Sequence, residues 1–83
     1  MPQFIDFKLK RAFIAVVETQ DYENAAKLLG ITANVLRDEI EALENELCLV
    51  LFARDAGAVI PTREGQILIR AFRKAAERQT RKE

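Results

Sequence analysis

Hydrophobic residues recur at helical spacing in four stretches of the chain, separated by short segments rich in turn residues. The first stretch, residues 7–19, places apolar side chains on one face and basic ones towards the outside. The second, residues 22–29, is short. Asp21 is a good N-cap for it, and Gly30 can adopt the left-handed conformation that ends a helix. The chain is therefore expected to open with a helix, a second short helix and a tight turn.

A longer helix is expected after this turn, followed by a small β-hairpin. Thr32 can cap the helix, and apolar residues at spacings of four, three and four form one stripe that ends near Leu47. Two short apolar segments, Leu49–Phe52 and Val59–Ile60, then flank a turn at 54–57. This pattern predicts two antiparallel strands.

The last stretch predicts a long helix over 62–78, followed by a polar tail over 79–83. Thr62 can cap the start of the helix, and Glu64 is favourably placed near its positive end. The expected inner face of this helix consists of Leu68, Ala71, Phe72 and Ala75.

Length and composition describe one small globular domain. The 83 residues suffice to bury a single core, and 49% of them are hydrophobic and 31% charged. We therefore expect one domain over 1–83, with its core and hairpin at 7–61. No apolar run approaches the roughly 18–20 residues that span a bilayer, and no secretory leader is visible at the start, so we expect a cytoplasmic protein without a membrane partner.

Few residues suit catalysis or metal binding. The chain has no histidine, a single cysteine and three scattered glycines. This composition excludes His-dependent triads, removes the usual zinc ligands and leaves no phosphate-cradling loop. We expect neither an enzyme nor a metal or cofactor site, and we expect Cys48 to be a small packed side chain.

The segment Asn24–Thr32 is the most telling part of the sequence. Two adjacent alanines, Ala25 and Ala26, permit close approach of helices, a glycine-containing turn follows, and a hydroxyl caps the next helix. A tight helix pair of this kind can present its second helix to the major groove of DNA. A compact αα-hairpin without that function would carry the same residues.

Three later motifs are more particular: Leu43-Glu44-x-Glu46-Leu47, Leu51-Phe52-x-Arg54 and Thr62-x-x-Gly65. They follow Phe13–Glu18 and Ala25–Thr32 in order. With these residues the chain resembles, from Phe7 to about Ala76 and without gaps, the N-terminal domain of LysR-type transcriptional regulators. The resemblance implies a mainly α, winged helix-turn-helix fold: a three-helix core, a short β-hairpin wing and a long C-terminal linker helix.

The resemblance also implies how such a domain works. The third helix would lie in the major groove of double-stranded DNA, and the wing would touch the flanking backbone or minor groove. The last helix would pair two copies into a homodimer. The effector-sensing domain that normally follows is not among these 83 residues, which would be either one part of a longer regulator or a free-standing head; no small-molecule effector is expected within this chain.

Carried over position by position, the resemblance assigns DNA contacts to the third helix and to the residue before the wing. Thr32 and Arg54 would touch phosphates, and base reading would fall to Ala33, Asn34, Arg37 and Asp38. Arg37 is the best candidate, because it alone brings positive charge to the third helix.

Dimerisation is expected from a separate feature, the apolar excess on the last helix. Its apolar residues exceed what one inner face requires, which favours a partner helix. The residues concerned are Ile67, Ile69 and Phe72.

Charge departs from the family pattern. Residues 32–47 hold one basic residue against five acidic ones, a net charge of −4, whereas residues 63–83 hold seven basic against three acidic, a net charge of +4. The unusual acids are Asp38, Glu39 and Glu41, and the wing carries Gly57, Ala58 and Ile60 where the family is usually basic.

Three functions are compatible with this mixture. The leading one is a dimeric, sequence-specific DNA-binding regulator. The alternative is a protein-interaction module, derived from a DNA-binding head, that binds a protein partner or antagonises a related regulator through its acidic third helix or its last helix. A weak, nonspecific nucleic-acid binder is least favoured, because it needs a net positive charge that this neutral chain lacks.

Overall fold

Four helices and one two-stranded hairpin make up the described part of the chain. The structure is a computed structural model that describes residues 7–80, with side chains from 7 to 75. In chain order the elements are α1 (Phe7–Thr19), α2 (Tyr22–Leu29), α3 (Ala33–Leu47), β1 (Phe52–Asp55), β2 (Ala58–Pro61) and α4 (Arg63–Thr80). The mainly α, winged helix-turn-helix fold is confirmed. The last helix runs two residues beyond its expected end at 78, and residues 81–83 of the expected tail lie outside the described residues.

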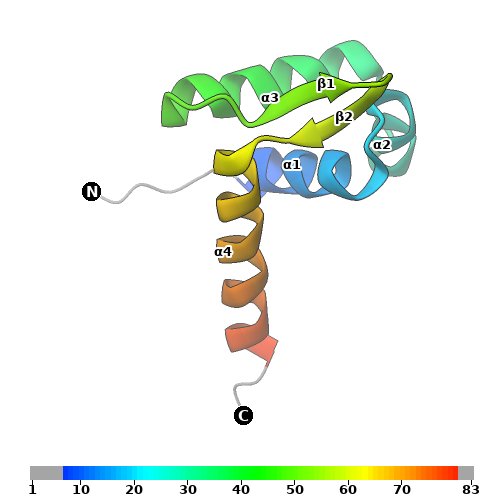
Figure 1. Ribbon diagram of the computed structural model, residues 1–83. Helices are drawn as coiled ribbons and strands as arrows, with labels where there is room; N and C mark the ends of the chain where they lie inside the picture. The colour runs from blue at the N-terminus through cyan, green and yellow to red at the C-terminus, as the bar shows by residue number, and fades with distance from the viewer. Residues whose placement is uncertain (1–6, 81–83) are drawn as a thin grey trace.

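The first three helices and the hairpin pack into one body, and α4 projects away from it (Figure 1). The molecule accordingly measures 40 × 26 × 22 Å along its principal axes. Phe13 of α1 is fully buried, and its ring centroid lies 5.3 Å from that of Phe52 in β1 and 5.7 Å from that of Phe72 in α4. Such aromatic pairs add about 0.5–1.5 kcal/mol beyond area burial, so they hold β1 and the first half of α4 against α1.

The expected tight turn joins α2 to α3. Asp21 caps α2, with its Oδ1 accepting from the backbone N–H of Glu23 at 3.0 Å. Gly30 ends α2 in the left-handed conformation at φ +72°, and the N–H of Ile31 donates to the carbonyl of Ala26 at 3.0 Å. The two alanines of α2 are buried, which lets the helices approach closely as the sequence predicted.

The hairpin begins three residues later than expected. β1 and β2 pair antiparallel from Phe52 opposite Pro61 to Asp55 opposite Ala58. The two-residue turn between them has positive φ at both positions, +53° at Ala56 and +86° at Gly57, which is the type I′ geometry that matches the twist of paired strands. The expected turn at 54–57 is therefore too long, and Arg54 lies in β1.

The segment 49–51, expected as a strand, is a connection held by Glu44. The Glu44 Oε2 accepts from the backbone N–H of Leu51 at 2.7 Å and from that of Phe52 at 3.4 Å. The Leu51 side chain is fully buried. Because the carboxylate satisfies these backbone donors, the segment can enter the core without a partner strand.

The Thr62-x-x-Gly65 motif joins the start of α4 to this connection. The Thr62 hydroxyl donates to the carbonyl of Val50 at 2.6 Å and accepts from the N–H of Gly65 at 3.1 Å. A Cβ at Gly65 would overlap the backbone carbonyl oxygen of Leu51. Glycine therefore allows a close approach that fixes how α4 sits on the body.

The inner face of α4 is only partly the one that the sequence predicts. Leu68 and Phe72 pack against the body as expected, but the expected inner residues Ala71 and Ala75 are exposed. Gly65 and Ile69, which are not expected on this face, are buried against the body.

Candidate nucleic-acid interface

Of the expected base-reading residues, Asn34, Arg37 and Asp38 are exposed on α3, whereas Ala33 is half-buried and packs against the core. Residues three or four positions apart share a face of a helix, and the four assigned positions are related in this way. The opposite face of α3 is buried through Leu36, Ile40 and Leu43. The outward face begins at the N-cap and carries Thr32, Asn34, Arg37 and Asp38, with Ala33 at its half-buried edge.

Thr32 has a structural role at the start of this face. Its Oγ1 accepts from the backbone N–H of Val35 at 3.1 Å, which caps α3. The residue is exposed, and its hydroxyl proton remains available to an acceptor outside the helix. The cap and a phosphate contact are therefore compatible.

Two basic residues from different elements meet at one aromatic ring. The guanidinium carbon of Arg37, on α3, lies 5.1 Å from the centroid of the Tyr22 ring, and that of Arg54, on β1, lies 6.0 Å from it. Both arginines are exposed, and Tyr22 is half-buried at the first position of α2. The fold thus brings together the third-helix and wing arginines that the sequence assigned separately.

The surroundings of Tyr22 favour its neutral form. Burial raises the pKa of the phenol above its ordinary value of 10.0, and the Glu44 carboxylate raises it further, while Arg54 and Arg37 act in the opposite direction. The ring therefore has two positive groups and one negative group within electrostatic reach.

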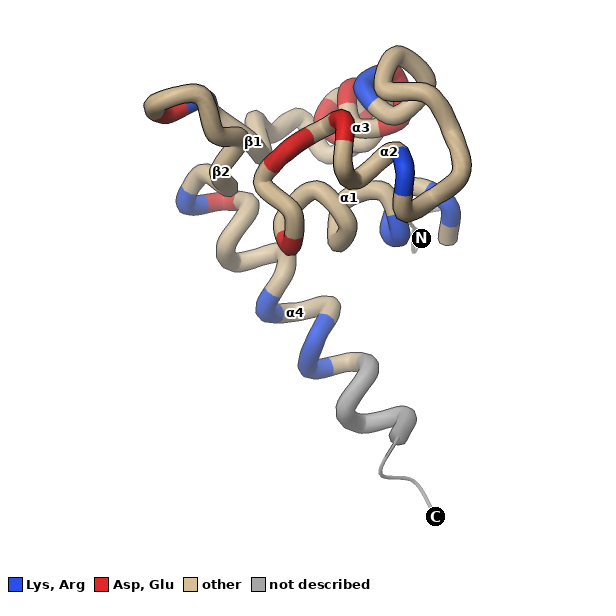
Figure 2. Tube along the Cα trace, turned by 90° about the vertical axis from the view of Figure 1, so that its right-hand side faces the viewer, with Lys and Arg blue, Asp and Glu red and all other residues tan. Residues whose placement is uncertain are grey.

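Acidic and basic positions are separated over the molecule. Figure 2 shows acidic positions gathered on α3 and basic positions along α4. On α3, Asp38 and Glu41 are exposed and Glu39 is half-buried, while Glu44 is engaged with the segment before β1. Over the part of α4 whose side chains are described, residues 63–75, the exposed basic residues are Arg63, Arg70, Arg73 and Lys74.

The residues assigned to dimerisation fall in different environments. Ile67 is 58% exposed, but Ile69 is only 7% exposed and belongs to the core. Phe72 is half-buried, packs edge-on against Phe13, and has the Lys10 ammonium 5.1 Å from its ring centroid. Ile69 and Phe72 thus attach α4 to its own chain, and of the three residues Ile67 is the one that is exposed.

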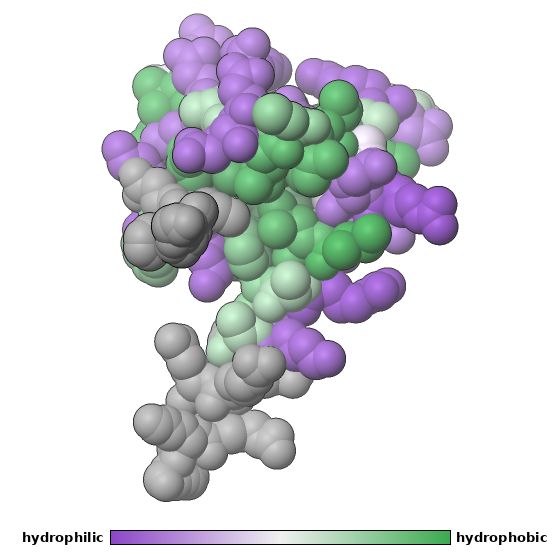
Figure 3. Space-filling view, turned by 90° about the vertical axis from the view of Figure 1, so that its left-hand side faces the viewer, coloured by the Kyte–Doolittle hydropathy of each residue, from purple (hydrophilic) through white to green (hydrophobic). Residues whose placement is uncertain are grey.

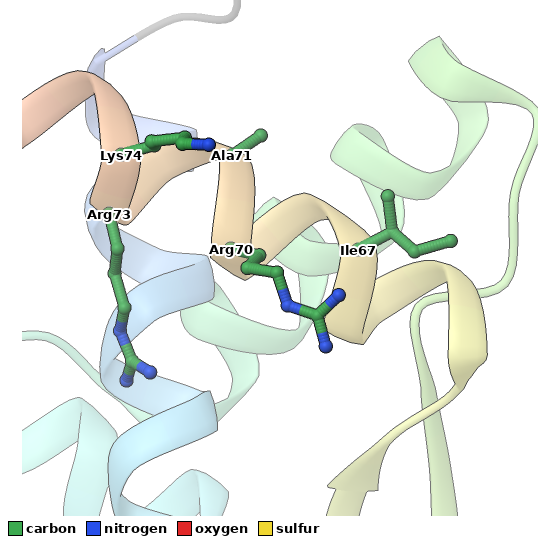
Figure 4. Close-up of a pocket in the computed structure, with 5 residues that line it drawn as sticks. All are labelled: Ile67, Arg70, Ala71, Arg73 and Lys74. Atoms are coloured by element: carbon green, nitrogen blue, oxygen red, sulfur yellow. The ribbon is translucent and has the colours of Figure 1, made fainter.

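The outward side of α4 continues an apolar surface of the body. Figure 3 shows hydrophobic side chains gathered where the end of α3 and the segment before β1 meet α4. The exposed hydrophobic residues of these segments are Leu49, Val50 and Ile67. A neighbouring hollow of about 410 Å³ is lined from α4 alone, by Ile67, Arg70, Ala71, Arg73 and Lys74 (Figure 4).

The described residues offer no metal centre or membrane span. Among residues 7–80, no group of three or more His, Cys, Asp or Glu side chains is placed to hold a metal ion. Over the same range, no helix is both long and apolar enough to cross a bilayer.

Residues 7–66 match the family described as bacterial regulatory helix-turn-helix proteins, lysR family. The chain belongs to the LysR family. Its relatives include the transcriptional regulator XapR of Escherichia coli K12, which is 38% identical over 69 residues. That match covers 83% of this chain but 24% of XapR, so the chain spans about a quarter of this LysR-family relative. The similarity is to a transcriptional regulator rather than to an enzyme.

Solved structures of LysR-family DNA-binding domains share the fold. The BenM domain in complex with benA site 1 DNA is 32% identical, with a TM-score of 0.83 over 92% of this chain and 88% of that one. The CbnR domain in a DNA complex is 28% identical, with a TM-score of 0.81 over 93% of this chain and 88% of that one.

Sequence reasoning missed two residues of this interface. The hydrophobic pattern marks Tyr22 only as the start of a short helix, and the resemblance includes Glu44 only as one residue of the motif Leu43-Glu44-x-Glu46-Leu47. Nothing in the hydrophobic period distinguishes either residue. That Tyr22 is the chain's single tyrosine, next to a capping aspartate, is a signal too weak to find it.

Proposed function

We propose that the chain is the DNA-binding domain of a bacterial transcriptional regulator that recognises specific sequences in double-stranded DNA. The observation that carries the proposal is the exposed face of α3, with Arg37 beside Arg54 of the wing, on a fold shared with domains solved in complex with DNA. Such a regulator would act in the cytoplasm, where the bacterial chromosome lies.

Each assigned residue has a role that fits its chemistry. With α3 in the major groove, Arg37 would bond a guanine edge, Asn34 an adenine edge, and Asp38 would accept from a cytosine amino group. The methyl group of Ala33 would contact a thymine methyl. Thr32 and Arg54 would bond phosphates on either side and set the register.

The acidic character of α3 shapes the expected affinity. Each neutralised phosphate adds about 0.9 to the slope of log affinity against log salt. With a net charge of −4 over residues 32–47, this domain would make few such contacts near the groove. We therefore infer that the affinity for DNA depends only modestly on salt concentration, and that discrimination between DNA sequences depends mainly on contacts with base edges.

We further infer that two copies pair through the outward side of α4. Ile67 and Ala71 are exposed and four residues apart, so they lie on one face of the helix. A self-complementary contact at this face would give a two-fold dimer, and the recognised DNA would then have dyad symmetry.

Selection from random duplex DNA by the purified chain tests this function. We expect recovery of a dyad-symmetric motif at low salt. Arg37→Ala should then cost about 1–3 kcal/mol and relax preference at one position of each half-site, whereas Arg54→Ala should weaken all sequences alike and lower the salt slope by about 1.

Arg11→Ala is the matched control, because it removes the same charge from an exposed position of α1 to which the proposal gives no contact with DNA or with a second copy. It should leave the recovered motif unchanged. Absence of any enriched sequence at low salt would contradict the proposal, and would leave the acidic face of α3 to be tested against a protein partner.

A further inference from the structure

Tyr22 occupies a position where three elements meet. It begins α2, and its ring lies 5.1 Å from the guanidinium of Arg37 on α3 and 6.0 Å from that of Arg54 on β1. Both distances are within the roughly 6 Å at which a cation is attracted to the face of an aromatic ring. One half-buried side chain therefore contacts two exposed arginines that lie 17 positions apart in the sequence.

Restraint of these arginines matters because free arginine side chains are costly to immobilise. Ordering one rotamer-rich side chain on binding costs about 0.5–1.5 kcal/mol, and arginine is among the most flexible. An arginine already held over a ring has lost part of that freedom before DNA arrives. A ring shared by two arginines also fixes the distance between their guanidinium groups.

We propose that Tyr22 is a positioning residue for DNA recognition: its ring holds Arg37 and Arg54 at a set separation, so that one can reach a base edge while the other reaches a phosphate. The inference rests on the proposed function, and it adds a residue that touches neither base nor phosphate in that scheme.

Glu44 adds a negative charge near the two arginines that share the Tyr22 ring. Two guanidinium groups near one ring repel each other, and the Glu44 carboxylate lies within electrostatic reach of the same ring. The backbone N–H groups of Leu51 and Phe52 hold that carboxylate in place, at 2.7 and 3.4 Å from its Oε2. A fixed negative charge near the ring that both arginines share would offset part of their repulsion.

The binding test compares Tyr22→Leu with Tyr22→Phe on the DNA site selected by the wild-type chain. Removing the ring should weaken binding about 5- to 30-fold, as expected if each arginine loses a weak cation–π restraint. Tyr22→Phe keeps the ring and should bind within about twofold of wild type. Equal losses in both variants, or a Tyr22→Leu variant that binds as well as or better than wild type, would overturn the inference.

Coupling between residues separates positioning from general loss of structure. In the Arg54→Ala background, Tyr22→Leu should cause a smaller fold-loss than in wild type, because only Arg37 remains to be restrained. A loss of the same size in both backgrounds would mean that Tyr22 acts independently of Arg54, which contradicts the inference.

Absorbance titration of the phenol tests the contacts without DNA. Tyr22 is the only tyrosine and the chain has no tryptophan, so the signal is unambiguous. Since both arginines lower the pKa of Tyr22, Arg37→Ala and Arg54→Ala should each raise it further, and Arg73→Ala should not. An unchanged pKa in both variants would overturn the inference even if the chain binds DNA.

The two proposals fail in different ways. If the wild-type chain enriches no DNA, the proposed function fails and the positioning role with it. If it enriches a motif but Tyr22→Leu binds that motif normally, only the positioning role fails.

Discussion

At the residue scale, three non-glycine residues between positions 7 and 80 adopt positive φ, and each follows or closes an element. They are Gln20 at +60°, Cys48 at +58° and Ala56 at +53°. A left-handed conformation costs an ordinary residue roughly 1–2 kcal/mol. At Cys48 the cost is offset because its backbone N–H bonds the carbonyls of Asn45 and Glu44 and so closes α3. The expectation that Cys48 is packed is wrong: its side chain is exposed.

Cys48→Gly should therefore stabilise the fold. Glycine removes the conformational cost at the end of α3, while the exposed thiol has little packing to lose. We expect the free energy of unfolding in urea to rise by about 1 kcal/mol, less than the full cost because glycine also loosens the unfolded chain.

Gly30→Ala is the reciprocal control, because it removes a glycine from a left-handed position instead of introducing one. Gly30 has φ +72° at the end of α2, and a Cβ added there would meet nothing within 4 Å, so the substitution tests the backbone conformation alone. It should lower stability by about 1 kcal/mol. A Cys48→Gly variant that is no more stable than wild type would show that the left-handed backbone at position 48 carries no conformational free-energy cost in the folded protein.

At the element scale, the sequence predicts the helices well because their ends carry residue types that cap or terminate a helix. Asp21, Gly30 and Thr32 mark boundaries of α2 and α3 through hydrogen bonds and left-handed backbone that these residue types favour. The strand predicted at 49–52 is misplaced because a short apolar run has the same pattern as a buried strand. The segment 49–52 is apolar because Leu51 enters the core. Its backbone N–H groups bond the carboxylate of Glu44, on the preceding helix, rather than a partner strand.

The inner face of α4 could be predicted only in part from hydrophobicity: Leu68 and Phe72 are expected there, but the burial of Gly65 is not. The start of α4 lies close to the body because Gly65 meets the Leu51 carbonyl. Gly65 has no side chain, so a hydrophobic pattern does not reveal this contact. The same limit applies to the candidate site: the exposed face of α3 follows from helical period, but the meeting of Arg37 and Arg54 at Tyr22 depends on three-dimensional packing.

Glu44 is the side chain on which the connection between α3 and the wing depends. Glu44→Ala leaves the N–H groups of Leu51 and Phe52 without their charged acceptor, and should lower the free energy of unfolding by about 1.5–3 kcal/mol. Glu44→Gln retains an oxygen acceptor and should cost about half as much. Chemical denaturation measures the loss, and faster hydrogen exchange at the Leu51 amide locates it.

Glu46→Ala is the matched control, since it removes an exposed carboxylate from the same helix. Its effect should stay within about 0.5 kcal/mol. If Glu44→Ala costs no more than this control, the hydrogen bonds from the segment before β1 contribute nothing beyond what water provides.

At the scale of the whole molecule, the projecting α4 presents a surface of different character from that of the body. The body presents the α3 face and the wing, whereas α4 offers an apolar side flanked by basic residues (Figures 2 and 3). Phe13 links the two parts, because its ring packs against both Phe52 and Phe72. A partner on α4 would therefore be rigidly coupled to the orientation of the DNA-reading face.

Ile67 is where this coupling can be broken without harming the fold. The residue is 58% exposed, so Ile67→Glu places a charge in solvent in the isolated chain, whereas in a two-fold dimer the two carboxylates would be buried against each other or against Ala71. Sedimentation should find wild type at twice the 9.4 kDa chain mass and Ile67→Glu at that mass, with unchanged unfolding. Gln66→Glu adds the same charge at the adjacent exposed position and should remain dimeric.

The same variant decides whether pairing serves recognition. Two heads joined through α4 bind a dyad site with the effective concentration of a linked pair, whereas a single head binds each half-site alone. Ile67→Glu should therefore lose its preference for the two-half site over an isolated half-site and yet retain the base preference of each half. If the Ile67→Glu chain stays dimeric, the dimer contact lies on another surface, because a carboxylate is not tolerated at the centre of an apolar helix pair.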